Sequence, residues 1–395
     1  MHPSFGRYAR QSLSALLCAA AFVAAGCHGN NNTSGFGIGW VTLSETPGDF
    51  TSYTVNVDSV TMTGVANGLI TAIGTPETVD FTKLSNISEL WSAASIPDDT
   101  YISASIVLDY SNANISVMVN GVPTQATVVD TANKPVTLQT INVIFDKANQ
   151  PIIQPTFAST SAIRLAINFD LAASNTVNMA ASPPIVTVQP FMTASTSAPD
   201  TKPVRVRGPL INSSIGIGSY TVFVRPFFDE VNSLGSLTLF GDANTVYTIN
   251  TATYVGAPGL NVLQQTSAGT TVTQAITTYE PSPTLNSSVT GGKFNATFVV
   301  AGSTLEDFYT QGIEGDVIAR NGNTVTLRSS TLQFNDGTSR YNDADAVLLL
   351  GPATIVTAEN NTTLKGLDYN SVAVGQHIIA RGICVSPCSG AVTLD

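Results

Sequence analysis

The sequence has 395 residues, of which only 11 % are charged, and its formal net charge is −11. This acidic balance argues against nucleic acid as a partner, because binding to a phosphate backbone requires an excess of Lys and Arg. Thr, Ser, Asn and Gly are abundant instead, a composition that suits β-strands and turns and is poor for helical bundles. The length is sufficient for two or three domains with cores of their own.

The N-terminus predicts a signal peptide of the lipoprotein type, residues 1–26. Arg7 and Arg10 precede an apolar run that has the length of a signal h-region and is too short to cross a bilayer as a helix. The run ends at Ala24-Ala25-Gly26-Cys27, which resembles the lipobox of bacterial lipoproteins. In such proteins a diacylglycerol is attached to the cysteine, and the chain is cut before it. We therefore predict lipidation of Cys27.

The residues that follow Cys27 indicate where the protein resides. Residues 27–35 are polar and rich in Gly and Asn, as in a flexible tether that holds a folded body away from a membrane. In bacterial lipoproteins, a residue other than Asp after the lipidated cysteine, here His28, favours the outer membrane. We expect an exported, lipid-anchored protein of the bacterial cell envelope. The alternative is an ordinary signal peptide in which Cys27 has no role.

Residues 36–192 predict a β-sandwich domain. Alternating apolar and polar residues, separated by turn residues, predict strands at 37–46, 53–62, 65–73, 77–81, 101–110, 114–120, 136–145, 162–171 and 185–191. Asn120-Gly121 predicts a hairpin turn. Residues 84–91 have apolar side chains at helical spacing and predict one short helix. Strands without alternating helices favour a Greek-key sandwich over a parallel α/β sheet.

Several motifs of this domain carry a resemblance to a known family. The longer ones are Gly-Trp-Val-Thr-Leu-Ser-Glu-Thr-Pro-Gly at 39–48, Ile-Pro-Asp-Asp-Thr-Tyr-Ile-Ser-Ala-Ser-Ile-Val-Leu at 96–108 and Leu-Ala-Ile-Asn-Phe-Asp-Leu at 165–171, and the shorter ones are Tyr-Thr-Val-Asn-Val-Asp-Ser-Val at 53–60, Val-Asp-Phe at 79–81 and Leu90. Their order resembles an uncharacterised family of bacterial lipoprotein domains, domain of unknown function 4382. The chain departs from that family at Glu45-Thr46, where Asp-Ala is usual, and at Asp99, where Gly is usual. The resemblance implies no activity.

A Ser/Thr/Pro-rich linker, 193–203, precedes an imperfect internal repeat. The first unit is 204–311 and the second is 312–395. Segments of the first unit recur in order in the second: 220–225, 237–241 and 245–249 correspond to 323–328, 347–351 and 354–357. The two units resemble the barrel-like domains of a second uncharacterised family, domain of unknown function 5666. We expect two small, five-stranded, partly open Greek-key barrels of the OB type.

Cys384 and Cys388 form the last cysteine pair of the chain once the signal peptide is removed. In an oxidising envelope this spacing predicts a small disulfide loop at the C-terminus. A metal site is the alternative, but only His28 and His377 could add soft ligands to the two thiolates.

The sequence contains no recognisable catalytic motif. His377 is the single histidine in the predicted folded body, so a Ser-His-Asp or Cys-His centre would have to use this one residue. We interpret His377 as a strand residue that closes the second barrel. Neither Gly-x-Ser-x-Gly nor His-Glu-x-x-His occurs. We expect no enzyme activity and no cofactor, with an envelope hydrolase as a remote alternative.

An acidic loop of the second repeat is a candidate cation site. Asp336, Asp343 and Asp345 flank this loop and could offer carboxylate oxygens to Ca²⁺, which needs six to eight oxygen ligands. The spacing is not that of an EF-hand, so a solvated loop is the alternative.

Aromatic residues of the repeats are candidates for ligand binding. Tyr220, Phe228 and Tyr341 lie in or beside predicted strands, where their rings could stack on sugars or pack in a core. The sequence thus predicts a membrane-anchored binding or structural module of the envelope, whose partner is a glycan or an envelope protein. A carbohydrate-binding lipoprotein is the sharper alternative.

The predicted disulfide should contribute little to stability. Its loop is smaller than a 15-residue loop, whose closure is worth about 3 kcal/mol in the chain-entropy account. Replacing both Cys384 and Cys388 with Ser should therefore fray the C-terminus and leave the thermal midpoint nearly unchanged. Mass spectrometry of the unreduced protein checks the bond itself, and two alkylatable thiols at these positions would refute it.

Overall fold

The computed structural model describes residues 36–120, 122–145, 156–157, 162–196, 202–226, 233–250, 252–281, 292–302, 311–333, 339–342, 345–354, 356, 367–382 and 393–394. Strands dominate these residues, and the helical segments among them are short. The chain is therefore all-β, as composition and patterning predict. The predicted signal peptide and tether lie outside the described residues.

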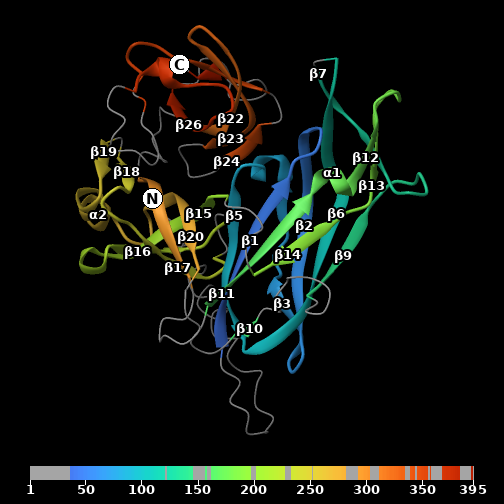
Figure 1. Ribbon diagram of the computed structural model, residues 1–395, viewed down its shortest axis with the longest axis horizontal. Coiled ribbons are helices and arrows are strands. Elements are labelled where there is room, and N and C mark those ends of the chain that lie inside the picture. Colours follow the sequence, from blue (N-terminus) through green and yellow to red (C-terminus); the bar gives the residue numbers. More distant parts are fainter. Residues whose placement is uncertain are drawn as a thin grey trace, which may run out of the picture. The chain divides into compact units, whose positions relative to one another are not determined.

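Two sheets enclose the first hydrophobic core (Figure 1). In the first sheet, β1 (Phe36–Thr46) is parallel to β11 (Ala162–Asp170) and antiparallel to β5 (Ser88–Pro97). The second sheet is built on the antiparallel pair β2 (Phe50–Gly64) and β6 (Asp99–Val119). Buried side chains of both sheets, such as Leu43 and Tyr53, belong to one cluster, so this part of the chain is the predicted β-sandwich.

The remaining elements of the sandwich are short. They are β3 (Gly68–Ile73), β4 (Glu77–Asp80), η1 (Phe81–Leu84), β7 (Val122–Gln125), β8 (Thr127–Val129), β9 (Leu138–Ile144), β10 (Thr156–Phe157), α1 (Leu171–Ser174), β12 (Asn175–Asn178), β13 (Ile185–Val188) and β14 (Met192–Ser195). The strands predicted at 101–110 and 114–120 are one continuous strand, β6. The hairpin predicted at Asn120 is confirmed, because Asn120 has φ of 50° and β6 pairs with β7 across it.

The helix predicted at 84–91 is wrong. A single 3₁₀ turn, η1, ends at Leu84, and β5 begins at Ser88. The first six residues of β5 are all buried, because this strand lies between β1 and β15 (Val204–Ser214) in the middle of the first sheet. A strand that is buried on both faces loses the alternation of polar and apolar residues, so its apolar positions can match helical spacing by chance.

The first repeat unit folds as a closed five-stranded barrel. Besides β15, its strands are β16 (Ser219–Phe223), β17 (Ser236–Phe240), β20 (Val272–Glu280) and β21 (Lys293–Ala301). The ring runs from β15 to β16 and β17, crosses in parallel from β17 to β21, and returns through β20 to β15. This is the five-stranded Greek-key barrel expected from the sequence. Added to it are η2 (Ile215–Ile217), β18 (Val246–Ile249), β19 (Ala252–Val255) and α2 (Ala257–Gln264).

The second repeat unit forms a sheet of its own. Its elements are β22 (Gln311–Asn321), β23 (Thr324–Gln333), β24 (Ser339–Asn342), β25 (Ala346–Leu349), η3 (Tyr369–Ser371), β26 (His377–Gly382) and β27 (Thr393–Leu394). β22 pairs with β23 and with β26, just as β15 pairs with β16 and with β20. The internal repeat is therefore visible in the pairing of its first strand. The described strands form an open path from β26 to β27.

The sandwich and the first barrel share one sheet. β15 pairs in parallel with β5 at Val204 and Arg205, opposite Ser88 and Glu89, which makes the sheet 11-stranded. The predicted linker is accordingly not all loop, since its first three residues belong to β14 and Pro203 accepts a backbone hydrogen bond from Ser88. This pairing places Arg205 directly beside Glu89.

One glycine in β15 is required by a close backbone approach. Gly208 has φ of 147°, and a Cβ atom there would lie 1.6 Å from the carbonyl oxygen of Phe223. Gly208→Ala should therefore destabilise the protein by more than about 2 kcal/mol, since backbone must move. Gly216→Ala is the matched control, because a Cβ there meets no atom within 4 Å. Urea unfolding of both variants checks this, and equal midpoints would contradict the expected difference.

Candidate functional site

Arg205 is the centre of a buried network of charged side chains. Its Nε donates to Oε2 of Glu89 at 2.6 Å, and its Nη1 donates to Oε1 of Glu314, also at 2.6 Å. None of the three side chains is more than 1 % exposed. They come from β15, β5 and β22, that is, from the first barrel, the sandwich and the second repeat. One cation thus bridges three parts of the fold.

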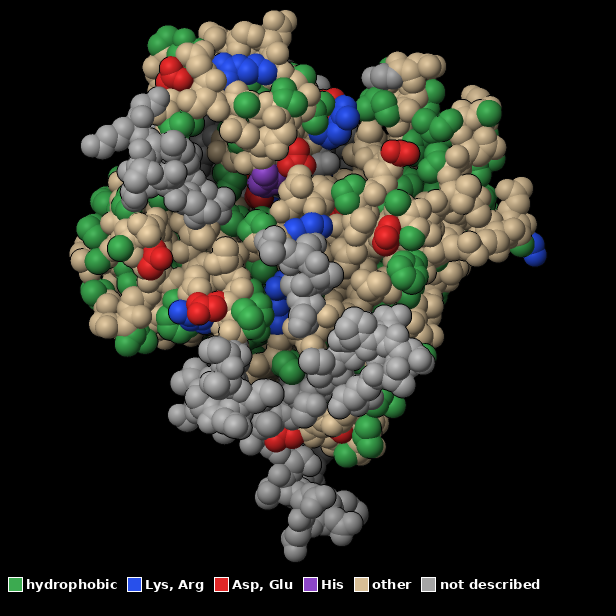
Figure 2. All heavy atoms as spheres, viewed as in Figure 1, with side chains coloured by type: hydrophobic (Ala, Val, Ile, Leu, Met, Phe, Trp, Pro, Cys, Tyr) green, Lys and Arg blue, Asp and Glu red, His purple; other side chains and the backbone are tan. Residues whose placement is uncertain are grey.

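The network continues from Glu314 toward the surface. Gln274 donates to Oε2 of Glu314 at 3.2 Å, and Nε2 of His377 lies 3.1 Å from Oε1. The other ring nitrogen of His377, Nδ1, lies 2.8 Å from Oδ1 of Asp316, which also accepts from Nδ2 of Asn86 at 2.9 Å. The histidine is visible in a hollow of the surface next to acidic side chains (Figure 2).

The charges of the network set each other's protonation. Burial alone would raise the pKa of Glu314, but Arg205 and His377 outweigh it and hold this pKa well below its usual range. Burial alone would lower the pKa of His377, but its hydrogen bonds to Asp316 and Glu314 outweigh it and raise this pKa to about 9. Both groups are therefore charged at neutral pH. A histidine that already carries its proton cannot accept another as a general base.

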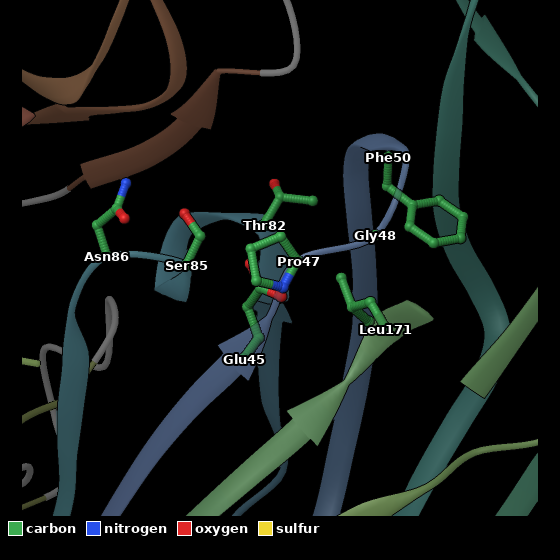
Figure 3. Close-up of a pocket in the computed structure, with 8 residues that line it drawn as sticks. All are labelled: Glu45, Pro47, Gly48, Phe50, Thr82, Ser85, Asn86 and Leu171. Atoms are coloured by element: carbon green, nitrogen blue, oxygen red, sulfur yellow. The ribbon is translucent and has the colours of Figure 1, made fainter. Parts of the chain in front are cut away.

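A pocket of about 180 Å³ lies close to this network (Figure 3). Its residues come from the end of β1, the turn to β2, the η1 segment and the start of α1. They are Glu45, Pro47, Gly48, Phe50, Thr82, Ser85, Asn86 and Leu171. Asn86 belongs to both sites, because it lines the pocket and donates to Asp316 of the network.

Glu45 is the ionisable side chain of the pocket wall. It is 1 % exposed, and its Oε2 has no hydrogen-bond partner among the described residues. Burial raises the pKa of Glu45 to about 8; the charge of Lys202 acts against this, and those of Asp80, Asp170 and Asp316 add to it. A carboxyl with a raised pKa is mostly protonated at neutral pH, and this protonation avoids the cost of burying a charge.

Sequence reasoning missed both sites. Glu45 drew notice only as a departure from the resembling family, and Arg205 and Glu89 drew none. One signal could have indicated these sites: Glu45, Glu89 and Arg205 are charged residues inside strands, in a chain that has few charged residues. Glu89 and Glu314 lie 116 and 109 residues from Arg205 in the sequence, so only the fold brings the three side chains together.

Tyr220 and Tyr341 are the predicted aromatic site residues that lie within the described ranges. Tyr220 is fully buried in the core of the first barrel, as the alternative of core packing predicts. Packing against the core accounts for the ring, since β16 points this residue inward. Tyr341 lies in β24, opposite Thr331 of β23.

The predicted calcium site is only partly within the described residues. Asp345 accepts hydrogen bonds from Nε and Nη2 of Arg328 at 3.0 and 3.1 Å, so both of its oxygens are engaged in an ion pair. Within the described ranges, no cluster of three or more His, Cys, Asp or Glu side chains could hold a metal ion. The other predicted site residues lie outside those ranges; they are Cys27, Phe228, Asp336, Asp343, Cys384 and Cys388.

His377 lies in a strand, whereas closure of a second barrel by that strand is not seen among the described residues. It begins β26, which pairs with β22 at the edge of the second sheet, and its side chain is 29 % exposed. What the sequence does not reveal is its contact with Glu314 and Asp316.

Comparison with known proteins gives no relative. No family model, curated protein or solved structure matches the chain. The resemblances to the two uncharacterised families therefore stay predictions. No helix in the described part of the chain has the length and apolarity needed to cross a membrane.

Removing the charge of Glu314 should destabilise the protein. Glu314→Gln leaves Arg205 and His377 with less negative charge in a buried site, where breaking an ion pair costs about 3 kcal/mol or more. Because the pKa of His377 is raised, its stabilising effect is complete below its unfolded pKa of 6.5 and is lost as the pH rises through about 9.

The difference in unfolding free energy between wild type and Glu314→Gln should therefore be largest near pH 6 and shrink toward pH 10. Urea unfolding across this range measures it. Glu280→Gln is the control, because it removes an exposed partner of Lys293, and solvent screens such surface pairs, so stability should hardly change. A pH-independent difference would contradict the role given to His377.

Proposed function

We propose that the protein is a lipid-anchored binding protein of the bacterial cell envelope, with no catalytic role. One observation carries the proposal: Arg7 and Arg10, an apolar segment, the Ala24-Ala25-Gly26-Cys27 motif and a Gly/Asn-rich tether occur in this order. The lipid would hold the protein at the outer membrane. The acidic body, with its low content of charged residues, would be presented beyond the tether to a glycan or an envelope protein.

The polar groups of the described residues support binding rather than catalysis. The charges around Arg205 are engaged with one another, and His377 carries its proton at neutral pH. The pocket wall contains one ionisable side chain, Glu45, whereas hydrolysis by paired acids requires two. With about 180 Å³, the pocket is smaller than the roughly 300 Å³ at which ligand pockets usually begin, so it could admit only a small chemical group.

A carbohydrate-binding lipoprotein is the second candidate. The observation that favours it is the combination, in the same pocket, of the Phe50 ring with the polar side chains of Thr82, Ser85 and Asn86. A glycan array probed with the full-length processed protein distinguishes it, since the general binding role requires no sugar to be retained.

The lipid anchor is tested by replacing Cys27. In cells fed with labelled palmitate, the wild type should incorporate the label and fractionate with membranes, whereas Cys27→Ser should do neither. Cys18→Ser is the matched control, because Cys18 lies in the predicted signal peptide and is removed with it. Label in Cys27→Ser, or equal loss of label in both variants, would overturn the proposed anchor.

A further inference from the structure

The end of the sandwich at which β1 begins carries exposed apolar side chains. Phe36, the first residue of β1, is 59 % exposed. Val65 and Leu69, in the hairpin from β2 to β3, are each 69 % exposed, and Ile102 of β6 and Ile144 of β9 are exposed as well. Figure 1 shows the start of β1, β3 and β10 at this end of the sandwich and β7 at the opposite end.

Strand pairing brings these positions together. Phe36 pairs with Pro97 at the end of β5, and β6 begins at Asp99, directly after that end. Val65 follows β2, and its amide donates to the carbonyl oxygen of Thr100 in β6 at 3.0 Å. The start of β1 and the β2–β3 hairpin therefore meet at the same corner of β6.

Two of the apolar side chains lie in one row across the outer face of the second sheet. Thr63 of β2 pairs with Leu69 of β3 and with Ser103 of β6, and Ser103 pairs in turn with Ile144 of β9. Residues that pair in register lie on the same face of a sheet, so Leu69 and Ile144 lie on either side of two small polar residues. The next row, farther from this end, is polar throughout: Thr71, Thr61, Ser105 and Asn142. On these rows the apolar side chains are confined to the end of the face.

The backbone donors at the tip of the hairpin already have partners. The carboxylate of Asp99 accepts hydrogen bonds from the amide of Ala66 at 3.1 Å and from the amide of Asn67 at 2.7 Å. Backbone donors that lose water without gaining a partner are costly in an apolar medium. Because these two donors are satisfied within the protein, the tip can approach an apolar surface without that cost.

The charge of this end indicates the kind of surface that it meets. Its strand ends and hairpin contain Asp98 and Asp99 but no Lys or Arg; they are residues 36–38, 63–70, 97–103, 143–145, 156–157 and 162–163. Anionic lipids attract segments that are rich in Lys and Arg, so they are not favoured here. A zwitterionic phospholipid surface accepts apolar side chains without requiring a cationic partner.

Chain connectivity ties the same end to the predicted anchor. From Cys27 to Phe36 the chain advances by nine residues, which span at most about 30 Å even when fully extended. If Cys27 carries a lipid, Phe36 therefore stays within that reach of the bilayer surface. The end of the sandwich that has the exposed apolar side chains is the end that the anchor keeps near the membrane.

We propose that this end of the sandwich, defined by Phe36, Val65, Leu69, Ile102 and Ile144, rests on the zwitterionic phospholipid surface of the membrane that holds the lipid of Cys27. The apolar side chains enter the interface between headgroups and acyl chains, where binding grows with the apolar area that is covered. The lipid keeps the protein at the membrane, and the apolar end fixes which face of the body meets it. The inference deepens the proposed function and rests on it, since it names the docking surface of the anchored protein.

Quenching of tryptophan fluorescence by brominated phosphatidylcholine tests the inference in the full-length lipidated protein. The sequence has two tryptophans, Trp40 and Trp91, and both are buried, so their contribution to the quenching is small. Val65→Trp should lose roughly half or more of its added emission in brominated compared with plain phosphatidylcholine vesicles, because this position lies in the interface. Val122→Trp is the matched control, because Val122 is 61 % exposed at the opposite end of the sandwich, and its emission should hardly change.

Removal of the apolar side chains of the row should undo the contact. In the protein that carries Val65→Trp, the added pair Leu69→Ser and Ile144→Ser should reduce the quenching at least twofold. Leu138→Ser is the control for this pair, because Leu138 is an exposed residue at the other end of β9 and should leave the quenching unchanged. Circular dichroism verifies that the variants fold.

Three results would overturn the inference. The first is equal quenching, or no quenching, of Val65→Trp and Val122→Trp. The second is quenching that requires phosphatidylglycerol in the vesicles, since this end has no cation to attract an anionic lipid. The third is an emission of Val65→Trp that shifts to the blue in vesicles without being quenched by brominated lipid, which would assign the surface to a second copy or to another protein.

Failure here is distinguishable from failure of the proposed function. If labelled palmitate enters at Cys27 but Val65→Trp is not quenched, the docking surface is wrong and the lipid anchor stands. If Cys27 takes up no palmitate while Val65→Trp is quenched when vesicles are added to the isolated protein, the anchor is wrong and the docking surface stands.

Discussion

The guanidinium of Arg205 is buried between two carboxylates that belong to distant parts of the chain. A charge removed from water in this way is tolerated only with its counter-ions in place, so Glu89 and Glu314 restrict how β5, β15 and β22 are arranged. Asp316 lies two residues beyond Glu314 on β22, and it holds the amide of Asn86. The polar end of the Glu45 pocket therefore depends on the same arrangement that neutralises Arg205.

Charge neutralisation is uneven across these two neighbouring sites. Around Arg205, carboxylates and cations alternate, so that Glu314 ionises easily and His377 retains its proton. Around Glu45, burial is the main reason that the carboxyl resists ionisation; the charge of Lys202 acts against this effect, and those of Asp80, Asp170 and Asp316 add to it. The first arrangement, in which each buried charge has a counter-ion, suits an ion-pair network that links β5, β15 and β22. The second keeps the buried Glu45 carboxyl mostly protonated at neutral pH.

Much of the strand pattern could be predicted from the sequence, because alternation records which face of a strand is covered. The alternation failed for β5, which is covered on both faces. It also predicted two strands where β6 is a single strand, because the register of β6 shifts against β2. The five-stranded barrel could be expected only from the resemblance of the repeat units to a family of barrel-like domains. The sites could not, since the acid partners of Arg205 lie more than a hundred residues from it in sequence. Spacing within a motif carries no information about such contacts.

The parallel pairing of β15 with β5 has a consequence for the order in which the chain folds. During synthesis, which starts at the N-terminus, β5 is complete more than a hundred residues before β15 is made. The edge of β5 that pairs with β15 therefore stays open during that time. Open edges of apolar strands invite pairing with other chains. Glu89, which is on this edge and points a charge at the missing strand, is the kind of residue that discourages such pairing until Arg205 arrives.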